Sequence, residues 1–205
     1  METPSLTEKE KMIMGMAYRP SDKQLSADRL KARELIFEFN RLPPKGFKQR
    51  KSIIKQLFAH TENMFYVEAP FNCDYGYNIS IGQNFYANFN LTILDCAPVN
   101  IGDNVFIGPN VSLFTAGHPM HPHLRNQHIE WAKPITIGNN VWICGNVCIN
   151  PGVTIGAGSV IGTGSVVTKD IPENVFAAGN PCQIIRTITD EEKDFFYKKH
   201  TIPSF

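Results

Sequence analysis

Aliphatic residues recur every six positions through most of the chain. The step runs through 81–93, 101–113 and 137–167, and glycine often follows the aliphatic residue, at Gly82, Gly102, Gly108, Gly138, Gly156 and Gly162. This step matches neither the period of a helix nor the alternation of a single strand. It fits short strands joined by tight turns, with one aliphatic side chain per strand pointing inward. Three steps make a triangular coil of about eighteen residues, and stacked coils build a continuous core.

Two interruptions of this step predict where the coil departs from regularity. A slip of two residues lies between Ile93 and Ile101. Between Leu113 and Ile137 the pattern is lost but its phase is kept, so 115–134 is expected to be a loop extruded from the coil. Long loops in compact folds are often functional. In the regular turns, glycine and asparagine, as in Gly138-Asn139-Asn140, are expected to supply the backbone angles.

The beginning of the chain follows a helical period instead. Thr7 and Glu10 have the spacing of a capping box. Ser26 is expected to cap a second helix, which "LPPKG" at 42–46 ends, and a third helical stretch reaches about His60. One face of the second helix is apolar at the helical spacing: Ala32, Leu35, Ile36 and Phe39. The predicted organisation is a helical region over 1–62, a coil over 63–188 and a tail over 189–205.

Composition narrows the class of protein. The 205 residues are 42% hydrophobic and 19% charged, which is typical of a globular protein. No apolar run is long enough to span a membrane, and the polar N-terminus does not resemble a signal peptide. Five cysteines without a CxxC spacing favour a reducing compartment, so a cytoplasmic location is expected. A net charge of +1 argues against nucleic acid as the main partner.

The repeats resemble those of the hexapeptide-repeat acyltransferases. Members of that family fold as left-handed parallel β-helices and usually form trimers, so the resemblance implies this hand and a homotrimer with sites between subunits. The sequence is most similar to the maltose and galactoside O-acetyltransferase branch, nearly end to end. The motifs that carry this similarity are "TEKEKMI" at 7–13, "CDYGYNI" at 73–79, "NFYANFN" at 84–90, "TIGNNVWI" at 136–143, "NPGVTIG" at 150–156, "VVTKDIP" at 166–172 and "AAGNPC" at 177–182.

Four of the six histidines lie in the extruded loop: His118, His121, His123 and His128. A metal site, one catalytic base and a polar loop without chemistry are the three alternatives. His118 and His123 have the spacing of a histidine pair in the γ-class carbonic anhydrases, which bind zinc through three histidines. Their third histidine comes from the coil before the pair, whereas 61–117 contains none here. Zinc needs three or four ligands, so no metal is expected.

The resemblance assigns catalysis to two residues. The segment "TAGHP" at 115–119 is similar to the active-site histidine segment of the family, which implies that His118 is the general base. Imidazole is suited to deprotonating a hydroxyl near neutral pH. Asn88 is implied as the donor that stabilises the oxyanion. The implied reaction is direct transfer of acetyl from acetyl-CoA to a sugar hydroxyl in a ternary complex, and His121, His123 and His128 are treated as solvated loop residues.

The same resemblance implies the binding residues. Lys169 and Arg186 are suited to meet phosphates, whereas Gln183 replaces a basic residue that is common in relatives. For the acceptor, carboxylates accept hydrogen bonds from hydroxyls and aromatic rings pack on sugar faces. The residues implied for acetyl-CoA are Asn88, Gly145, Thr163, Thr168, Lys169 and Arg186. Those implied for the acceptor are Asp22, Asp74, Tyr86, Asp95 and Trp142.

Other functions stay open from the sequence. Cys96 follows Asp95 where the galactoside enzymes carry an acidic pair, which favours a glucose or maltose acceptor over a galactoside. A drug or another small hydroxyl compound is an alternative acceptor. A γ-carbonic-anhydrase-like metal protein and a binding protein that has lost its activity are alternatives of other classes.

Overall fold

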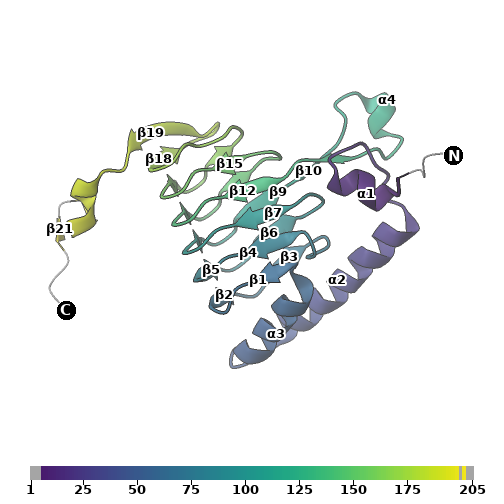
Figure 1. Ribbon diagram of the computed structural model, residues 1–205, viewed down its shortest axis with the longest axis horizontal. Coiled ribbons are helices and arrows are strands. Elements are labelled where there is room, and N and C mark those ends of the chain that lie inside the picture. Colours follow the sequence, from purple (N-terminus) through teal and green to yellow (C-terminus); the bar gives the residue numbers. More distant parts are fainter. Residues whose placement is uncertain (1–5, 199, 202–205) are drawn as a thin grey trace.

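The computed structural model describes residues 6–198 and 200–201, so the outermost parts of the expected helical region and tail, 1–5, 199 and 202–205, lie outside it. A stack of short strands forms the body, and a helical region runs along its side (Figure 1). A loop with a short helix leaves the stack near the N-terminal helix. The helices are α1 (Glu8–Ile13), α2 (Lys23–Arg41), α3 (Phe47–Leu57) and α4 (Pro122–Arg125).

The helical region follows its sequence signals except at one cap. The capping box of α1 is confirmed, because the Thr7 side chain accepts from the Glu10 N–H and the Glu10 carboxylate accepts in return. The expectation that Ser26 caps α2 was wrong. Asp22 Oδ1 accepts from two backbone N–H groups, at 2.9 and 3.2 Å, and Ser26 lies inside the helix. A carboxylate at this end also interacts favourably with the helix dipole.

Three sheets form the sides of the triangular coil. From β1 to β9, and again from β12 to β17, successive strands of the chain belong to the first, second and third sheet in turn, so each sheet gains one strand per coil. The first sheet contains β1 (His60–Thr61), β4 (Ile79–Ile81), β7 (Val99–Ile101), β12 (Ile135–Ile137) and β15 (Thr154–Ile155). The second contains β2 (Phe65–Val67), β5 (Phe85–Ala87), β8 (Phe106–Ile107), β13 (Trp142–Ile143), β16 (Val160–Ile161), β18 (Val175–Ala178) and β19 (Gln183–Thr187). The third contains β3 (Phe71–Cys73), β6 (Leu91–Leu94), β9 (Ser112–Phe114), β14 (Cys148–Ile149) and β17 (Val166–Val167).

The strand pairings within the coils are parallel, and the predicted fold class is confirmed: a left-handed parallel β-helix of hexapeptide repeats with an N-terminal helical region and an extruded loop. Antiparallel pairs occur at its margins. β10 (Ala116–Gly117) pairs with β11 (Trp131–Ala132), and β18 pairs with β19. The tail contains a 3₁₀ helix (Asp190–Asp194), β20 (Phe195–Tyr197) and β21 (His200–Thr201). Within the described ranges, the structure has no helix that is long and apolar enough to cross a membrane.

The register explains both interruptions of the six-residue step. Ile137 pairs with Ile155, eighteen residues further on, as a regular coil requires. Ile81 pairs with Ile101, twenty residues further on, because the coil contains the two-residue slip. Ile101 pairs with Ile137, two regular coil lengths away. The extruded segment therefore has the length of one extra coil, and the strands resume in phase after it.

The turns divide two tasks between asparagine and glycine. Asn104 and Asn140 have φ of 55° and 59°, and the side-chain amide of Asn104 donates to the side-chain oxygen of Asn140 at 3.2 Å. These angles lie in the left-handed region of backbone conformation, whereas Gly138 does not have a positive φ. A Cβ at Gly138 would lie 2.7 Å from the backbone nitrogen of Ala157 in the next coil. The expected backbone angles therefore come from asparagine at this turn, and Gly138 is needed because the coils approach closely.

Because Gly138 supplies space and asparagine supplies the backbone angle, two glycine substitutions are expected to differ in their effect on stability. Gly138→Ala forces the adjacent coils apart and is expected to destabilise the protein by about 1–3 kcal/mol, as overpacking does. Gly164 has φ of 75° with nothing within 4 Å of a Cβ, and Asn146 occupies the same turn one coil earlier. Gly164→Asn is expected to leave stability unchanged. Thermal unfolding checks both, and equal midpoints for Gly138→Ala and the unsubstituted protein would show that the close approach is unimportant.

Candidate active site

A groove on the second sheet collects several of the predicted residues. Its cavity is about 560 Å³, and Tyr86, Asn88, Trp142, Gly145 and Thr163 line it. Asn88 follows β5 in the turn toward the third sheet, and its Oδ1 accepts from the N–H of the next residue at 2.8 Å. That contact fixes the orientation of the amide, so Nδ2 is the atom that can donate to a ligand.

Aromatic side chains occupy consecutive levels of this groove. Tyr86 pairs with Phe106, and Phe106 pairs with Trp142, so one ring follows another along the coil axis. Phe106 and Trp142 are half-exposed, at 53% and 52%. The corresponding outward positions of the first sheet carry small polar side chains, Ser80, Asn100, Thr136 and Thr154. Sequence reasoning missed Phe106, although its register with Trp142 would have indicated it.

His118 lies at a different edge of the coil, between the third and first sheets. Three successive coils are irregular at this edge: the turn after β3 over 74–78, the turn after β6 over 95–98, and the extruded loop after β9. His118 comes directly after β10, and the pairing of Gly117 with Trp131 holds the base of the loop. Asp74 and Asp95 belong to the two turns of the same edge. The predicted residues therefore form two groups on one chain.

A carboxylate faces His118. Glu130 Oε1 lies 3.9 Å from His118 Nε2, which is an ion-pair distance and too long for a hydrogen bond. The imidazole side chain is 55% exposed and the carboxylate side chain 19%. The Tyr18 hydroxyl donates to the other carboxylate oxygen at 2.6 Å. Sequence reasoning missed Glu130 and Tyr18, although Glu130 is the one acidic residue in 115–134.

Asp95 does not have the position expected of an acceptor contact. It is fully buried, and its Oδ1 accepts from the backbone N–H groups of Asp74 and Tyr75 at 3.0 and 2.9 Å. Its backbone carbonyl accepts from the Asn78 side chain at 2.7 Å. Burial raises the pKa of Asp95 to about 7. The structure corrects the expected role, because this carboxylate holds the 74–78 turn and does not face solvent.

Asp74 and Cys96 lie next to each other at this edge. The Cys96 thiol donates to Asp74 Oδ2 at 3.6 Å. Asp74 is partly buried, and this burial raises its pKa. Burial likewise raises the pKa of the Cys96 thiol, so the thiol stays protonated and acts as a donor. Asp22, the remaining carboxylate predicted for the acceptor, lies at the N-terminus of α2, where its Oδ1 caps the helix.

The residues predicted for acetyl-CoA are also divided between the groove that contains Asn88 and the edge that carries His118. Gly145 and Thr163 line the groove with Asn88. Thr168 and Lys169 directly follow β17 of the third sheet and so lie toward the edge that carries His118. Arg186 lies on β19, where Glu192 holds its guanidinium in a two-point ion pair at 2.5 and 2.8 Å. A phosphate would have to compete with this carboxylate for Arg186.

The other loop histidines have local contacts. His121 Nδ1 accepts from the His123 N–H at 3.2 Å and caps α4. His128 has φ of 56°, in the left-handed region. Within 6–198 and 200–201, no three His, Cys, Asp or Glu side chains are grouped so that they could hold a metal ion.

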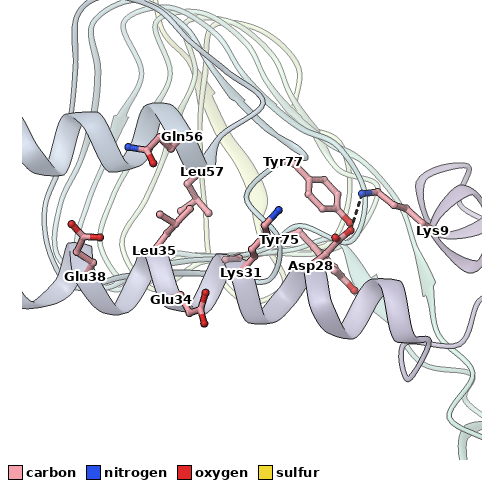
Figure 2. Close-up of a pocket in the computed structure, with 11 residues that line it drawn as sticks. Lys9, Asp28, Lys31, Glu34, Leu35, Glu38, Gln56, Leu57, Tyr75 and Tyr77 are labelled. Carbon is pink, nitrogen blue, oxygen red and sulfur yellow. Dashed lines mark hydrogen bonds and ion pairs between the residues drawn. The ribbon is translucent and has the colours of Figure 1, made fainter.

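A separate cavity of about 720 Å³ lies between α2 and the 74–78 turn (Figure 2). Lys9 Nζ contacts Asp28 at 2.7 Å and lies 3.9 Å from the centre of the Tyr77 ring. Its lining carries charges of both signs, and none of the lining residues is among those predicted for catalysis or binding. The predicted chemistry therefore lies at the groove and at the His118 edge.

Comparison with known proteins decides the family. The maltose acetyltransferase hexapeptide capping motif matches residues 11–62, the hexapeptide repeat of succinyl-transferase matches 98–117, and the bacterial transferase hexapeptide (six repeats) matches 134–169. Galactoside O-acetyltransferase of Escherichia coli K12 is 50% identical over 95% of this chain and 96% of its own length. The chain belongs to the maltose and galactoside O-acetyltransferase family.

Solved structures agree with this family. A maltose O-acetyltransferase from Clostridium difficile 630 is 46% identical with a TM-score of 0.90, over 91% of this chain and all of its own. A galactoside acetyltransferase in complex with coenzyme A is 49% identical with a TM-score of 0.94, over 98% of this chain and all of its own. The resemblance found in the motifs is confirmed, and this acetyltransferase is an enzyme of the acyltransferase class.

The buried Asp95 of this acetyltransferase predicts a pH dependence of stability. Its folded pKa of about 7 exceeds its ordinary value, so the folded state binds this proton more tightly than the unfolded state. The contribution to stability is full below the ordinary pKa, near 4, and is lost as the pH rises toward about 7. Asp95→Asn does not titrate, so the stability of the unsubstituted protein relative to this variant is expected to fall over that range. Thermal unfolding against pH measures the difference, and a constant or rising difference is the contrary result.

Proposed function

We propose that this chain is a CoA-dependent O-acetyltransferase that moves acetyl from acetyl-CoA to a hydroxyl of a sugar by direct transfer in a ternary complex. The observation that carries the proposal is the match to galactoside O-acetyltransferase over nearly the whole of both chains. The related structure with bound coenzyme A supports CoA as the carrier. His118 and Asn88 supply the two chemical functions that the transfer requires.

The transfer needs a base and an oxyanion donor. His118 takes the proton of the acceptor hydroxyl as its oxygen attacks the carbonyl carbon of the thioester. Negative charge then develops on the carbonyl oxygen, and Asn88 Nδ2 donates a hydrogen bond to it. The tetrahedral intermediate collapses, the carbon–sulfur bond breaks, and the imidazolium returns the proton to the CoA sulfur. Acetyl sugar and free CoA thiol leave, so the reaction consumes no other reactant.

Glu130 supports His118 in this scheme. Its carboxylate faces Nε2, so a proton is favoured on that nitrogen and Nδ1 is left to act as the base. When His118 takes the hydroxyl proton, a positive charge forms next to this carboxylate, which stabilises it. Glu130 therefore acts through His118 and does not touch the acceptor in this mechanism.

A homotrimer with sites between subunits is part of the proposal. On one chain, Asn88 lies in the turn from the second to the third sheet, whereas His118 lies between the third and first sheets. A site that uses both residues is completed when the groove of one subunit meets the His118 edge of its neighbour. The acetyl-CoA residues divide in the same way, since Gly145 lies in the groove and Lys169 lies toward the other edge. Closed rotational symmetry would build three identical sites.

The substrates are assigned within this interface. Acetyl-CoA lies along the groove at Asn88, Gly145 and Thr163 and extends to Thr168, and its phosphates meet Lys169 and Arg186. The acceptor lies near His118, where Asp74 and Asp22 accept hydrogen bonds and Tyr86 and Trp142 pack on the sugar. Phe106 belongs with the two aromatic residues because it lies between them in the register. A glucose or maltose acceptor is favoured over a galactoside, because Cys96 stands where the galactoside enzymes carry the second residue of an acidic pair. The Cys96 thiol donates a hydrogen bond to Asp74, whereas a carboxylate at this position could only accept one.

A cytoplasmic location belongs to the same proposal. Each of the five cysteines is unpaired: Cys73, Cys96, Cys144, Cys148 and Cys182. Free thiols persist in a reducing compartment.

An acceptor screen tests the function itself. CoA release from acetyl-CoA is measured with glucose, maltose, galactosides and hydroxyl-bearing drugs, and the product is identified by mass. The proposal expects release that depends on a sugar, with glucose or maltose the best acceptor. Release that depends only on a drug, or no release with any acceptor, would overturn it.

Mixed trimers test where the active site is built. Neither His118→Ala nor Asn88→Ala is expected to have appreciable activity alone, since a general base contributes about 10²–10⁴-fold and an oxyanion donor about 10²–10³-fold. When the two variants are co-expressed with different tags and mixed trimers are isolated, an intact His118 meets an intact Asn88 at one of the three interfaces of each mixed trimer, because closed rotational symmetry places each type of subunit once beside the other in this order. Activity should therefore return in the mixture. Mixed trimers that stay as inactive as the parents would place both residues in one subunit's site.

A further inference from the structure

Tyr18 joins the N-terminal segment to the loop that carries His118. Its backbone N–H donates to the Glu130 carbonyl, and its carbonyl accepts from the Glu130 N–H, both at 3.0 Å. Its hydroxyl donates to Oε2 of the same glutamate at 2.6 Å. One residue thus fixes Glu130 at both its backbone and its carboxylate, and Oε1 is left facing His118.

The surroundings of Tyr18 make this contact rigid. Its side chain is 1% exposed and lies in a small apolar cluster that is separate from the interior of the coil. The other buried members of this cluster are Met12, Leu25, Tyr75, Cys96, Ala97 and Ala132. Burial raises the pKa of Tyr18 far above its ordinary range, with Cys96 and Glu130 adding to the effect. The hydroxyl therefore keeps its proton and always acts as the donor to Glu130.

We propose that Tyr18 is a positioning residue for acetyl transfer, because its hydroxyl holds the Glu130 carboxylate in the orientation that directs Oε1 at His118. This inference rests on the proposed function. The gap of 3.9 Å between Glu130 and His118 is not bridged by a hydrogen bond of its own, so the pair depends on how each partner is held. The carboxylate side chain is 19% exposed, and without the phenol it is free to turn toward water.

This arrangement gives the N-terminal region a part in catalysis. Met12 of α1 and Leu25 of α2 pack around Tyr18, so the two helices position the phenol. The phenol positions the carboxylate, and the carboxylate faces the base. The helical region is therefore linked to His118 through a chain of contacts within one subunit, whereas Asn88 is expected to come from the next.

Tyr18→Phe tests the proposal with one atom removed. The ring, its burial and both backbone hydrogen bonds to Glu130 are retained, and only the donor is lost. We expect kcat to fall about tenfold, which corresponds to roughly 1.4 kcal/mol in the barrier. The KM for acetyl-CoA is expected to stay unchanged, because neither Tyr18 nor Glu130 is among the residues assigned to acetyl-CoA. Calorimetric binding of acetyl-CoA measures the active fraction and corrects kcat for any unfolded protein.

Tyr77→Phe is the matched control. Tyr77 packs against the same cluster, and its buried hydroxyl has no hydrogen-bond partner in the part of the chain that the structure describes. Figure 2 shows this side chain at the wall of the larger cavity, and none of the predicted site residues lines that cavity. The same chemical change is expected to leave kcat at its original value. A tenfold loss in Tyr77→Phe as well would assign the effect to packing and overturn the proposal.

A double-mutant cycle separates positioning from stability. If Tyr18 acts through Glu130, then Tyr18→Phe combined with Glu130→Ala should be no slower than Glu130→Ala alone. A purely structural role predicts losses that add. Additive losses, or full kcat in Tyr18→Phe while the unsubstituted enzyme acetylates sugars, would overturn this inference alone. An unsubstituted enzyme that is inactive toward every sugar would overturn the proposed function, and this inference with it.

Discussion

The parallel stacking of coils in fixed register is the constraint on which the rest of the structure depends. Each strand inside the stack bonds to the strand one coil below and one coil above, as Trp142 does with Phe106 and Val160. A residue's place in the coil therefore determines both its height along the axis and the face on which it lies. Insertions are tolerated only where they leave the ladder intact, which confines them to an edge. The largest insertion leaves and returns in phase, and it carries His118.

Much of the fold follows from this regularity and could be predicted. The six-residue step implied the coil, its inward aliphatic residues and the extruded loop, because periodic burial requires periodic sequence. Two local details did not follow. Asp22 and Ser26 are both good cap residues, and tertiary packing selects between them. Gly138 and Asn140 are both typical of turns, and only the distance to the next coil shows that Gly138 supplies space while Asn140 supplies the angle.

The candidate site is less regular, and less of it could be predicted. His118 and Asn88 were found through motif resemblance, and the roles proposed for them rest on that resemblance together with the geometry. Glu130 and Tyr18 lie 112 residues apart and meet only when the loop folds back on the N-terminal segment. Asp95 has the residue type of an acceptor ligand, yet the fold buries it beneath the turn that it stabilises. Non-repeating contacts of this kind leave no period in the sequence.

The central claim of the account is that each active site is formed by two edges of the coil, one from each of two neighbouring copies of the chain. A crystal structure of the protein with bound CoA tests it most directly. The account predicts a trimer in which the CoA sulfur lies between Asn88 of one subunit and the histidine at position 118 of its neighbour. A sulfur bound by residues of a single subunit, or CoA bound in the cavity beside α2, would contradict it.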